Sequence, residues 1–300
     1  MNKKILIAGG SGFIGYHLAK KALKKRYSVS IISTKRPLKK RYLKKVKYIY
    51  CDITNKKKLK KKLNSNFDFI VNLAGYVNHQ EKTKTYNSHY KGCKNLADIF
   101  LKKKFISFLQ IGSSAEYGHS KAPHSEFTKC DIKSNYAKAK FDAQNYLNKL
   151  YRKNDFKFNV IRLYQVYGPK QELNRFIPIV IHNCLKNKNF PSSEGKQSRD
   201  FLFIDDAVNA IFKVLNNKKS VNQTYNIGFG KPLNIKSLIM KIVNLCKGGK
   251  PLFGKIKLRK DESLLSYPNI LKAKKTLKWQ PKINIDEGLK KTINYYKLNN

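Results

Sequence analysis

The sequence GGSGFIG, residues 9–15, joins the apolar run Ile5-Leu6-Ile7 to a segment with helical periodicity. Gly9, Gly12 and Gly15 recur every three residues. This spacing permits a tight strand-to-helix turn, close approach of the backbone to a pyrophosphate and tight packing of the helix on the sheet. The helix that follows directs its free N–H groups at such a phosphate. The stretch therefore predicts a dinucleotide-binding turn.

Further strands and helices alternate after this turn. Short apolar runs predict strands at residues 29–32, 46–50, 67–73, 105–111 and 158–163. Helical patterns separate most of them, including residues 91–101 and the long segment 135–153. Such alternation is typical of a parallel sheet covered on both faces. The predicted fold class is α/β, a Rossmann-type doubly wound parallel sheet.

The regular alternation of predicted strands and helices ends after Gly168-Pro169, where the loops become longer and the apolar runs shorter. We therefore expect a Rossmann domain over residues 1–168. Residues 169–300 are expected to form mainly a smaller substrate-binding region. Within it, strand-like runs at 201–204 and 224–227 are expected to return to the edge of the Rossmann sheet, so the two parts share elements.

Composition fits one soluble enzyme of ordinary size. The chain has 300 residues, of which 41% are apolar, enough for a sizeable core. No apolar stretch has the length of a membrane span and no signal-peptide pattern is seen, so we expect a cytoplasmic protein without membrane insertion. The five cysteines are dispersed without a CxxC pair, and the six histidines are scattered as well. We predict neither a disulfide framework nor a metal site.

The net charge of +46 invites a nucleic-acid interpretation. However, the basic residues are spread over nearly every segment, and 56 of the 64 are lysine, whereas forked recognition of phosphates and bases favours arginine. We expect a solvated basic surface and no specific nucleic-acid partner. Such a surface can still steer an anionic substrate towards the protein.

Tyr136 and Lys140 lie four residues apart in YAKAK, so a helix places both side chains on one face. A tyrosine titrates near pH ~10, so it serves as a base at neutral pH only if a neighbouring cation stabilises its phenolate. Ser113, in GSSAEYG at the end of the fifth predicted strand, lies where ligands bind in open parallel sheets. These three residues form a candidate catalytic group.

Many ordered segments resemble the extended short-chain dehydrogenase/reductases, and specifically the NAD(P)-dependent epimerase/dehydratase family that modifies nucleotide sugars. The similarity extends over essentially the whole chain. It is carried by GGSGFIG, CDIT, NLAG, GSSAEYG, YAKAK, IRLYQVYGP, GKQSRDFLFIDD, YNIG and LKWQPKINIDEGL.

The resemblance implies a role for each matching position. Ser113 and Tyr136 would bind the sugar oxygen that undergoes redox, Tyr136 would transfer its proton, and Lys140 would hold the nicotinamide ribose. Cofactor contacts are implied for Gly9, Ser11, Gly12, Phe13, Ile14, Gly15, Asp52, Ile53, Leu73, Ala74, Gly75, Tyr136 and Lys140. Substrate contacts are implied for Ser114, Glu116, Arg175, Arg199 and Arg259, and the family implies a homodimer.

Departures from the family pattern narrow the expected reaction. Relatives that dehydrate the sugar carry an Asp-Glu pair directly after the residue with the catalytic hydroxyl. This chain has Ser114 and Ala115 at those two positions, and Glu116 lies one position beyond them. Relatives that catalyse 3,5-epimerisation use a Cys and a His, where the nearest counterparts are Ala115 and Arg175. The reaction that we expect is therefore hydride transfer at C4 of the sugar, catalysed by a 4-epimerase or a 4-keto reductase. The alternatives are a dehydratase that recruits Glu116, or a non-catalytic cofactor-binding or RNA-binding protein.

The choice between NAD and NADP depends on the end of the second strand. An acidic residue there would bind the ribose hydroxyls of NAD, whereas this chain has Ser33, Thr34, Lys35 and Arg36. Hydroxyls followed by two cations suit the 2′-phosphate of NADP. We therefore expect NADP or NAD, with NADP favoured.

Overall fold

A computed structural model describes residues 2–76, 78, 80–217, 219–258 and 262–299. Within them, seven parallel strands form the central sheet in the order β11-β6-β5-β4-β1-β2-β3. The chain reverses direction across the sheet between β1 and β4, as in a Rossmann fold. The strands are β1 Lys4–Ala8, β2 Ser28–Ser33, β3 Val46–Tyr50, β4 Phe69–Asn72, β5 Ser107–Ser113, β6 Phe158–Leu163 and β11 Gln223–Ile227.

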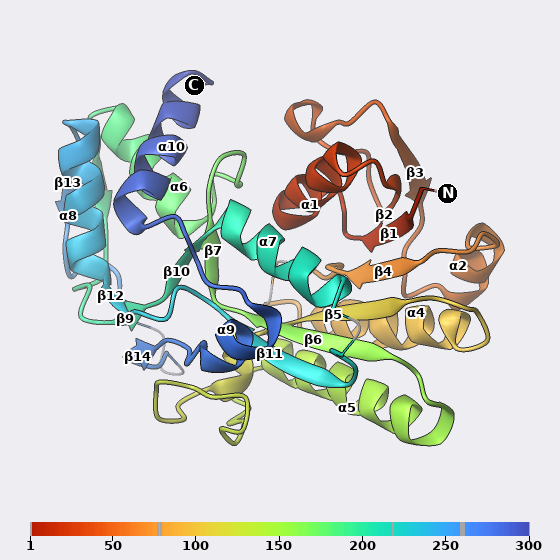
Figure 1. The fold of residues 1–300 in the computed structure, drawn as a ribbon. Coiled ribbons are helices and arrows are strands. Elements are labelled where there is room, and N and C mark those ends of the chain that lie inside the picture. Colours follow the sequence, from red (N-terminus) through yellow and green to blue (C-terminus); the bar gives the residue numbers. More distant parts are fainter. Residues whose placement is uncertain (1, 77, 79, 218, 259–261, 300) are drawn as a thin grey trace.

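Helices cover both faces of this sheet (Figure 1). One face carries α1 (Phe13–Lys24) and α7 (Ile204–Leu215), and the other carries α2 (Lys56–Lys62), α4 (Gly92–Phe100) and α5 (Asn135–Asn154). A short helix, α3 (Lys82–Tyr86), and a π-helical turn at Asn87–Lys91 lead into α4. The fold class predicted from the alternating pattern is therefore confirmed.

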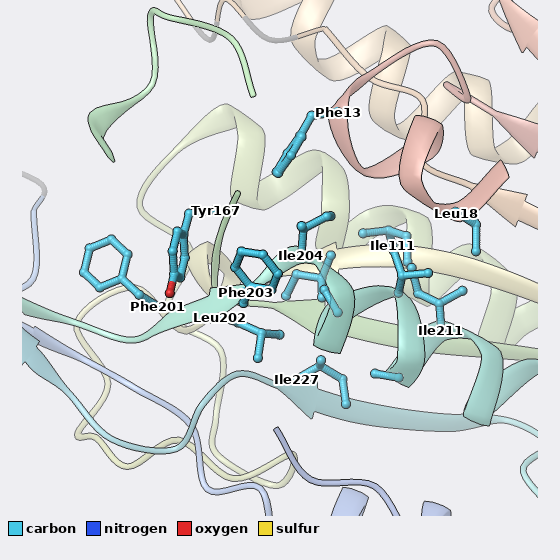
Figure 2. Close-up of a cluster of buried hydrophobic side chains, with 14 of the residues drawn as sticks. Phe13, Leu18, Ile111, Tyr167, Phe201, Leu202, Phe203, Ile204, Ile211 and Ile227 are labelled. Carbon is cyan, nitrogen blue, oxygen red and sulfur yellow. The ribbon is translucent and has the colours of Figure 1, made fainter. Parts of the chain in front are cut away.

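The strands read as nearly continuous apolar runs because both faces are buried. Two apolar clusters result, one on each side of the sheet. Figure 2 shows part of the first, in which Ile204 and Ile211 of α7 lie over the sheet near Ile111 of β5 and Ile227 of β11. This packing fixes the strand ends, from which the candidate site is built.

The remaining elements form a smaller region beside one end of the sheet (Figure 1). Three helices and three small sheets belong to it in the described residues, and a further helix, α9 (Leu271–Leu277), packs near β11. The bounds are α6 Phe176–Leu185, α8 Ile235–Cys246, α10 Ile285–Lys297, β7 Gln165–Tyr167, β8 Asn189–Pro191, β9 Ser198–Arg199, β10 Phe201–Phe203, β12 Leu233–Asn234, β13 Lys250–Leu252 and β14 Leu265–Ser266.

The two runs expected to rejoin the large sheet behave differently. β11 pairs in parallel with β6 and becomes its edge strand. β10 instead pairs with β7 in a separate two-stranded sheet. The physical reason is that β6 already has two neighbours, β5 and β11, so the edge position is taken. The chain thus leaves the large sheet after β6 and returns to it at β11.

Helices of the described ranges are too short or too polar for a bilayer crossing. In the same ranges, His, Cys, Asp and Glu side chains do not gather in threes at any place suited to a metal ion.

Candidate active site

The glycine turn between β1 and α1 has the geometry that a dinucleotide requires. Gly9 has φ +78°, and a Cβ there would lie 2.7 Å from the backbone nitrogen of Ala74. A Cβ on Gly15 would lie 2.5 Å from the Gly9 carbonyl oxygen. The first turn of α1, which begins after Gly12, has no side-chain cap and no acidic residue. Its N–H groups are therefore available to a phosphate, and the residues fit the pyrophosphate of a dinucleotide.

The end of β2 lies against this turn. The hydroxyls of Ser11 and Ser33 are 2.7 Å apart, and the Ser33 Oγ also lies 2.6 Å from the carbonyl oxygen of Lys35. The side chains of Thr34, Lys35 and Arg36 are exposed just beyond the strand. Two cations therefore flank the loop beside the glycine turn, where the second ribose of a dinucleotide would lie.

The segments after β3 and β4 lie close by. Asp52 is exposed and its Oδ1 accepts a hydrogen bond from the Thr54 nitrogen at 2.8 Å, whereas Ile53 is buried against Gly92. Leu73 and Ala74 are half-buried and Ala74 touches Gly9. The backbone there is held because Asn72 Oδ1 accepts the Ala74 N–H at 3.2 Å. The cofactor-binding residues expected from β1, β2, β3 and β4 thus meet at the carboxyl ends of the strands.

A feature that the sequence did not predict is the position of His89. Its imidazole lies directly on Gly75, where a Cβ would be 1.8 Å from the ring, and it lies edge-on to the Tyr136 ring with 4.9 Å between centroids. His89 is buried and its Nε2 is 3.2 Å from the Tyr76 carbonyl oxygen. The ring therefore supports one side of Tyr136.

Ser113, Tyr136 and Lys140 are brought together at the end of β5 and the start of α5. The Ser113 hydroxyl lies close enough to the Tyr136 hydroxyl to lower the pKa of the phenol. Lys140 is buried, with its Nζ 5.8 Å from the Tyr136 ring centroid, and it donates a hydrogen bond to the Ile111 carbonyl oxygen at 2.6 Å. The helical spacing predicted from YAKAK is present, since α5 begins at Asn135 with Ser134 as its N-cap.

The electrostatics of this group differ from the sequence-based expectation. Burial raises the pKa of Tyr136 above its ordinary value. The hydrogen bond to Ser113 and the charge of Arg175 oppose this rise, and Glu116 adds to it. Burial lowers the pKa of Lys140 to about 8, against the influence of Glu116. Ser113 and Arg175 lower the pKa of Tyr136, and the Lys140 ammonium beside its ring is held by a backbone carbonyl.

The expectation that Glu116 contacts substrate is contradicted by its position. It is completely buried; its Oε1 accepts the Ser113 N–H at 2.8 Å and its Oε2 pairs with Arg162 at 2.8 Å. Ser113 in turn caps the short helical turn that contains Glu116, which completes a capping box. The spacing Ser113-x-x-Glu116 is the sequence signal of such a box and could have indicated this role. Ser114 is half-buried beside it.

The expected substrate arginines occupy different settings. Arg175 is half-buried just before α6, and its charge acts on Tyr136. Arg199, on β9, donates to Glu262 at 2.9 Å and to the Ser263 carbonyl oxygen at 2.5 Å. Arg259 lies outside the described residues. Of the two described arginines, Arg175 lies close enough for its charge to act on Tyr136, while Arg199 is held by an acidic partner in the small region.

Comparison with known proteins agrees with this geometry. The model of the "NAD dependent epimerase/dehydratase family" matches residues 5–228. A putative UDP-glucose 4-epimerase of Methanocaldococcus jannaschii is 29% identical, covering 99% of both chains. Among solved structures, the UDP-glucose 4-epimerase of Thermotoga maritima with UDP-glucose has a TM-score of 0.93 at 23% identity, covering 99% of both chains. The UDP-glucuronic acid 4-epimerase of Bacillus cereus, in complex with UDP-glucuronic acid and NAD, has a TM-score of 0.89 at 23% identity, covering 99% of this chain and 100% of that one.

Proposed function

The chain belongs to the NAD dependent epimerase/dehydratase family, and we propose that it transfers a hydride at C4 of the hexose of a nucleotide sugar, as a 4-epimerase or a 4-keto reductase. The observation that carries the proposal is the grouping of Ser113 and Tyr136 beside buried Lys140, at the strand ends that also carry the glycine turn. A dinucleotide and a sugar carbon could meet at this edge of the sheet.

Ser113, Tyr136 and Lys140 each have a different role in the proposed reaction. Ser113 donates a hydrogen bond to the C4 oxygen and orients it against Tyr136. Tyr136 exchanges the proton of that oxygen, and Lys140 binds the ribose hydroxyls of the cofactor as an ammonium. A bound nicotinamide dinucleotide supplies the hydride acceptor and donor. Arg175, whose positive charge acts on Tyr136, stabilises negative charge that develops on the sugar oxygen.

The raised pKa of Tyr136 makes it a phenol at neutral pH. A phenol is the form that donates a proton, which is what a 4-keto sugar requires when it is reduced. The reverse step, removal of a proton from the C4 hydroxyl, needs the phenolate and hence a further positive charge beside the ring. The proton-donating step is common to a 4-keto reductase and to the second half of a 4-epimerase.

For the cofactor we propose NADP over NAD. The support is the pair of exposed cations Lys35 and Arg36 at the end of β2, with the exposed hydroxyl of Thr34 before them. Fluorescence titration with NADPH and NADH tests this. We expect tighter binding of NADPH, and loss of the difference in the K35M/R36M variant. The matched control is K39M/K40M, which removes two exposed cations from the following turn. If this control loses the preference for NADPH to the same extent, the preference comes from the overall positive charge and not from Lys35 and Arg36.

For the substrate we propose a sugar attached to a nucleoside diphosphate, with Arg199 and Arg259 as diphosphate ligands and Arg175 at the sugar. Arg199 is already oriented by Glu262, a partner that an incoming phosphate oxygen could replace. We further propose a homodimer, and a cytoplasmic role in the synthesis of cell-surface polysaccharide. Light scattering of the purified protein tests the homodimer. Cell fractionation tests the cytoplasmic location, and glycan analysis of a deletion strain tests the role in polysaccharide synthesis.

The reaction itself is tested with purified protein. Oxidation of NADPH by a 4-keto sugar nucleotide, followed by the absorbance of the reduced nicotinamide, is expected for the reductase. Interconversion of C4 epimers without added cofactor is expected for the epimerase. If neither reaction occurs across UDP-, CDP- and dTDP-linked hexoses, the proposal fails. The dehydratase alternative gains no support from Glu116, because both of its oxygens are engaged.

A further inference from the structure

The buried carboxylate of Glu116 joins three elements that carry the candidate catalytic group. It lies in the turn after β5, where its Oε1 accepts the backbone N–H of Ser113 at 2.8 Å. A Cβ on Gly112 would lie 2.7 Å from the same oxygen, so the backbone passes as close to the carboxylate as glycine allows. This contact fixes the backbone from which the Ser113 hydroxyl projects.

Arg162 on β6 connects this carboxylate to α5. Its Nε donates to Glu116 Oε2 at 2.8 Å, its Nη1 to the Tyr117 hydroxyl at 3.0 Å and its Nη2 to Gln144 Oε1 at 3.0 Å. Gln144 belongs to α5, the helix that carries Tyr136 and Lys140. Every hydrogen-bonding edge of the guanidinium is thus committed between the Ser113 turn and the tyrosine helix.

We propose that Glu116, held by Arg162, is a positioning residue that fixes Ser113 and maintains the charge of Lys140 beside Tyr136. The proposal rests on the proposed function in that Ser113, Tyr136 and Lys140 are taken as the reacting group. It assigns Glu116 no contact with substrate. Its effect passes through the Ser113 backbone and through the electric field of the buried carboxylate.

Burial raises the pKa of Glu116, and the Arg162 guanidinium at 2.8 Å opposes this rise and holds the group as a carboxylate. The titratable and charged groups that face Glu116 are Arg162 from β6, Lys140 and Tyr136 from α5, and Cys130 from the preceding loop. Tyr136 also faces Arg175 and His89, and Lys140 also faces Cys93 of α4.

Glu116 and Lys140 meet at adjacent residues of β5, because Lys140 bonds to the Ile111 carbonyl and the Glu116 carboxylate lies on Gly112. Glu116 acts on the two catalytic groups in the same direction. Burial lowers the pKa of Lys140 to about 8, and the Glu116 carboxylate is the largest of the influences that oppose this fall. The same carboxylate, after burial, raises the pKa of Tyr136. Without it, Lys140 would lose its proton at a lower pH. Glu116 therefore keeps the lysine protonated in the range where the tyrosine is a phenol.

The test uses the pH dependence of NADPH binding, which needs no sugar substrate. In the wild type, affinity is expected to fall as the pH rises through about 8, where Lys140 loses its charge. The E116Q variant keeps the side-chain shape but removes the charge. The pH at which NADPH affinity falls, called the break below, should then decrease by about 1 unit, which is the smallest pKa shift typical of a nearby charge. The E116D variant keeps the charge with a shorter reach, so its break should stay near that of the wild type.

The matched control is E126Q. Glu126 is a half-buried glutamate whose Oε1 accepts the Asn226 N–H at 2.8 Å, and Arg162 faces it as well. It is not among the groups that shift Tyr136 or Lys140. E126Q should therefore cost stability without moving the break. Equal pH profiles for E116Q, E126Q and the wild type would overturn the proposal, as a purely structural role for Glu116 would give that result.

A double variant covers the case in which E116Q alone does not fold. E116Q/R162M removes both buried charges and leaves neither unpaired, a change that is often neutral for stability. It should show the same downward shift of the binding break. If the break shifts as expected while no sugar nucleotide reacts, the proposed reaction fails and the role of Glu116 stands. If a sugar nucleotide reacts but the break does not move in the variants, the proposed reaction stands and the role of Glu116 is refuted.

Discussion

Replacement of Arg162 by methionine is expected to be among the most destabilising single changes in the chain. The side chain is buried and makes three bonds, to Glu116 at 2.8 Å and to Tyr117 and Gln144 at 3.0 Å each. Methionine fills part of the volume but leaves a carboxylate buried without its cation. Breaking a buried ion pair from one side costs about 3–5 kcal/mol. For a chain of 300 residues, an unfolding entropy of about 0.6 kcal/mol/K converts this to a fall in Tm of about 5–8 °C.

Urea denaturation at pH 7, followed by circular dichroism, measures the free energy of unfolding of R162M. The reference is the E116Q/R162M double variant, in which no charge is left unpaired. We expect the double variant to recover most of the stability lost in R162M, because burial of the lone carboxylate is the main cost. A loss below about 1 kcal/mol in R162M, the size of an exposed pair, would refute the reasoning. So would a double variant as unstable as the single one.

Three further outcomes are expected. Y136F should lower kcat by about 10²–10⁴-fold, the contribution of one acid–base group, while NADPH binding measured by fluorescence is retained. G9A should abolish NADPH binding because its Cβ would meet the Ala74 backbone at 2.7 Å, whereas G254A, with a similar φ of +80° but 4.0 Å of clearance, should cost only stability. Burial raises the pKa of Asp200 to about 7, above its unfolded value, so its protonated form stabilises the fold. Relative to D200N, the wild type should therefore lose stability as the pH rises from about 4 to about 7; a constant difference in urea denaturation would contradict this.

Local patterns predicted the frame of the site well. The strand-to-helix glycine turn and the four-residue spacing of Tyr136 and Lys140 are properties of a short segment, and the structure reproduces both. The alternation of strands and helices predicted the sheet because parallel strands buried on both faces leave a distinct apolar pattern. Such signals need no knowledge of distant contacts.

The rest depended on residues far apart in the chain. Arg162 is 46 positions from Glu116, and no periodicity relates them. The run at 201–203 has a strand pattern, but its partner was decided by competition for the edge of the large sheet, which β11 occupies. Similarly, Arg199 was predicted from its motif, whereas its pairing with Glu262 follows from how β9 and β14 lie together.

The burial of Glu116 also bears on which reaction this site can perform. Elimination of water from a hexose needs a carboxylate that can hold a proton close to the substrate, in addition to the tyrosine. Between Ser113 and Gly118 the chain carries one carboxylate, and its two oxygens are bonded to Arg162 and to the Ser113 backbone, out of reach of a ligand. The same bonds that orient Ser113 engage both oxygens of this acid, so Glu116 is placed to hold the serine rather than to meet a ligand.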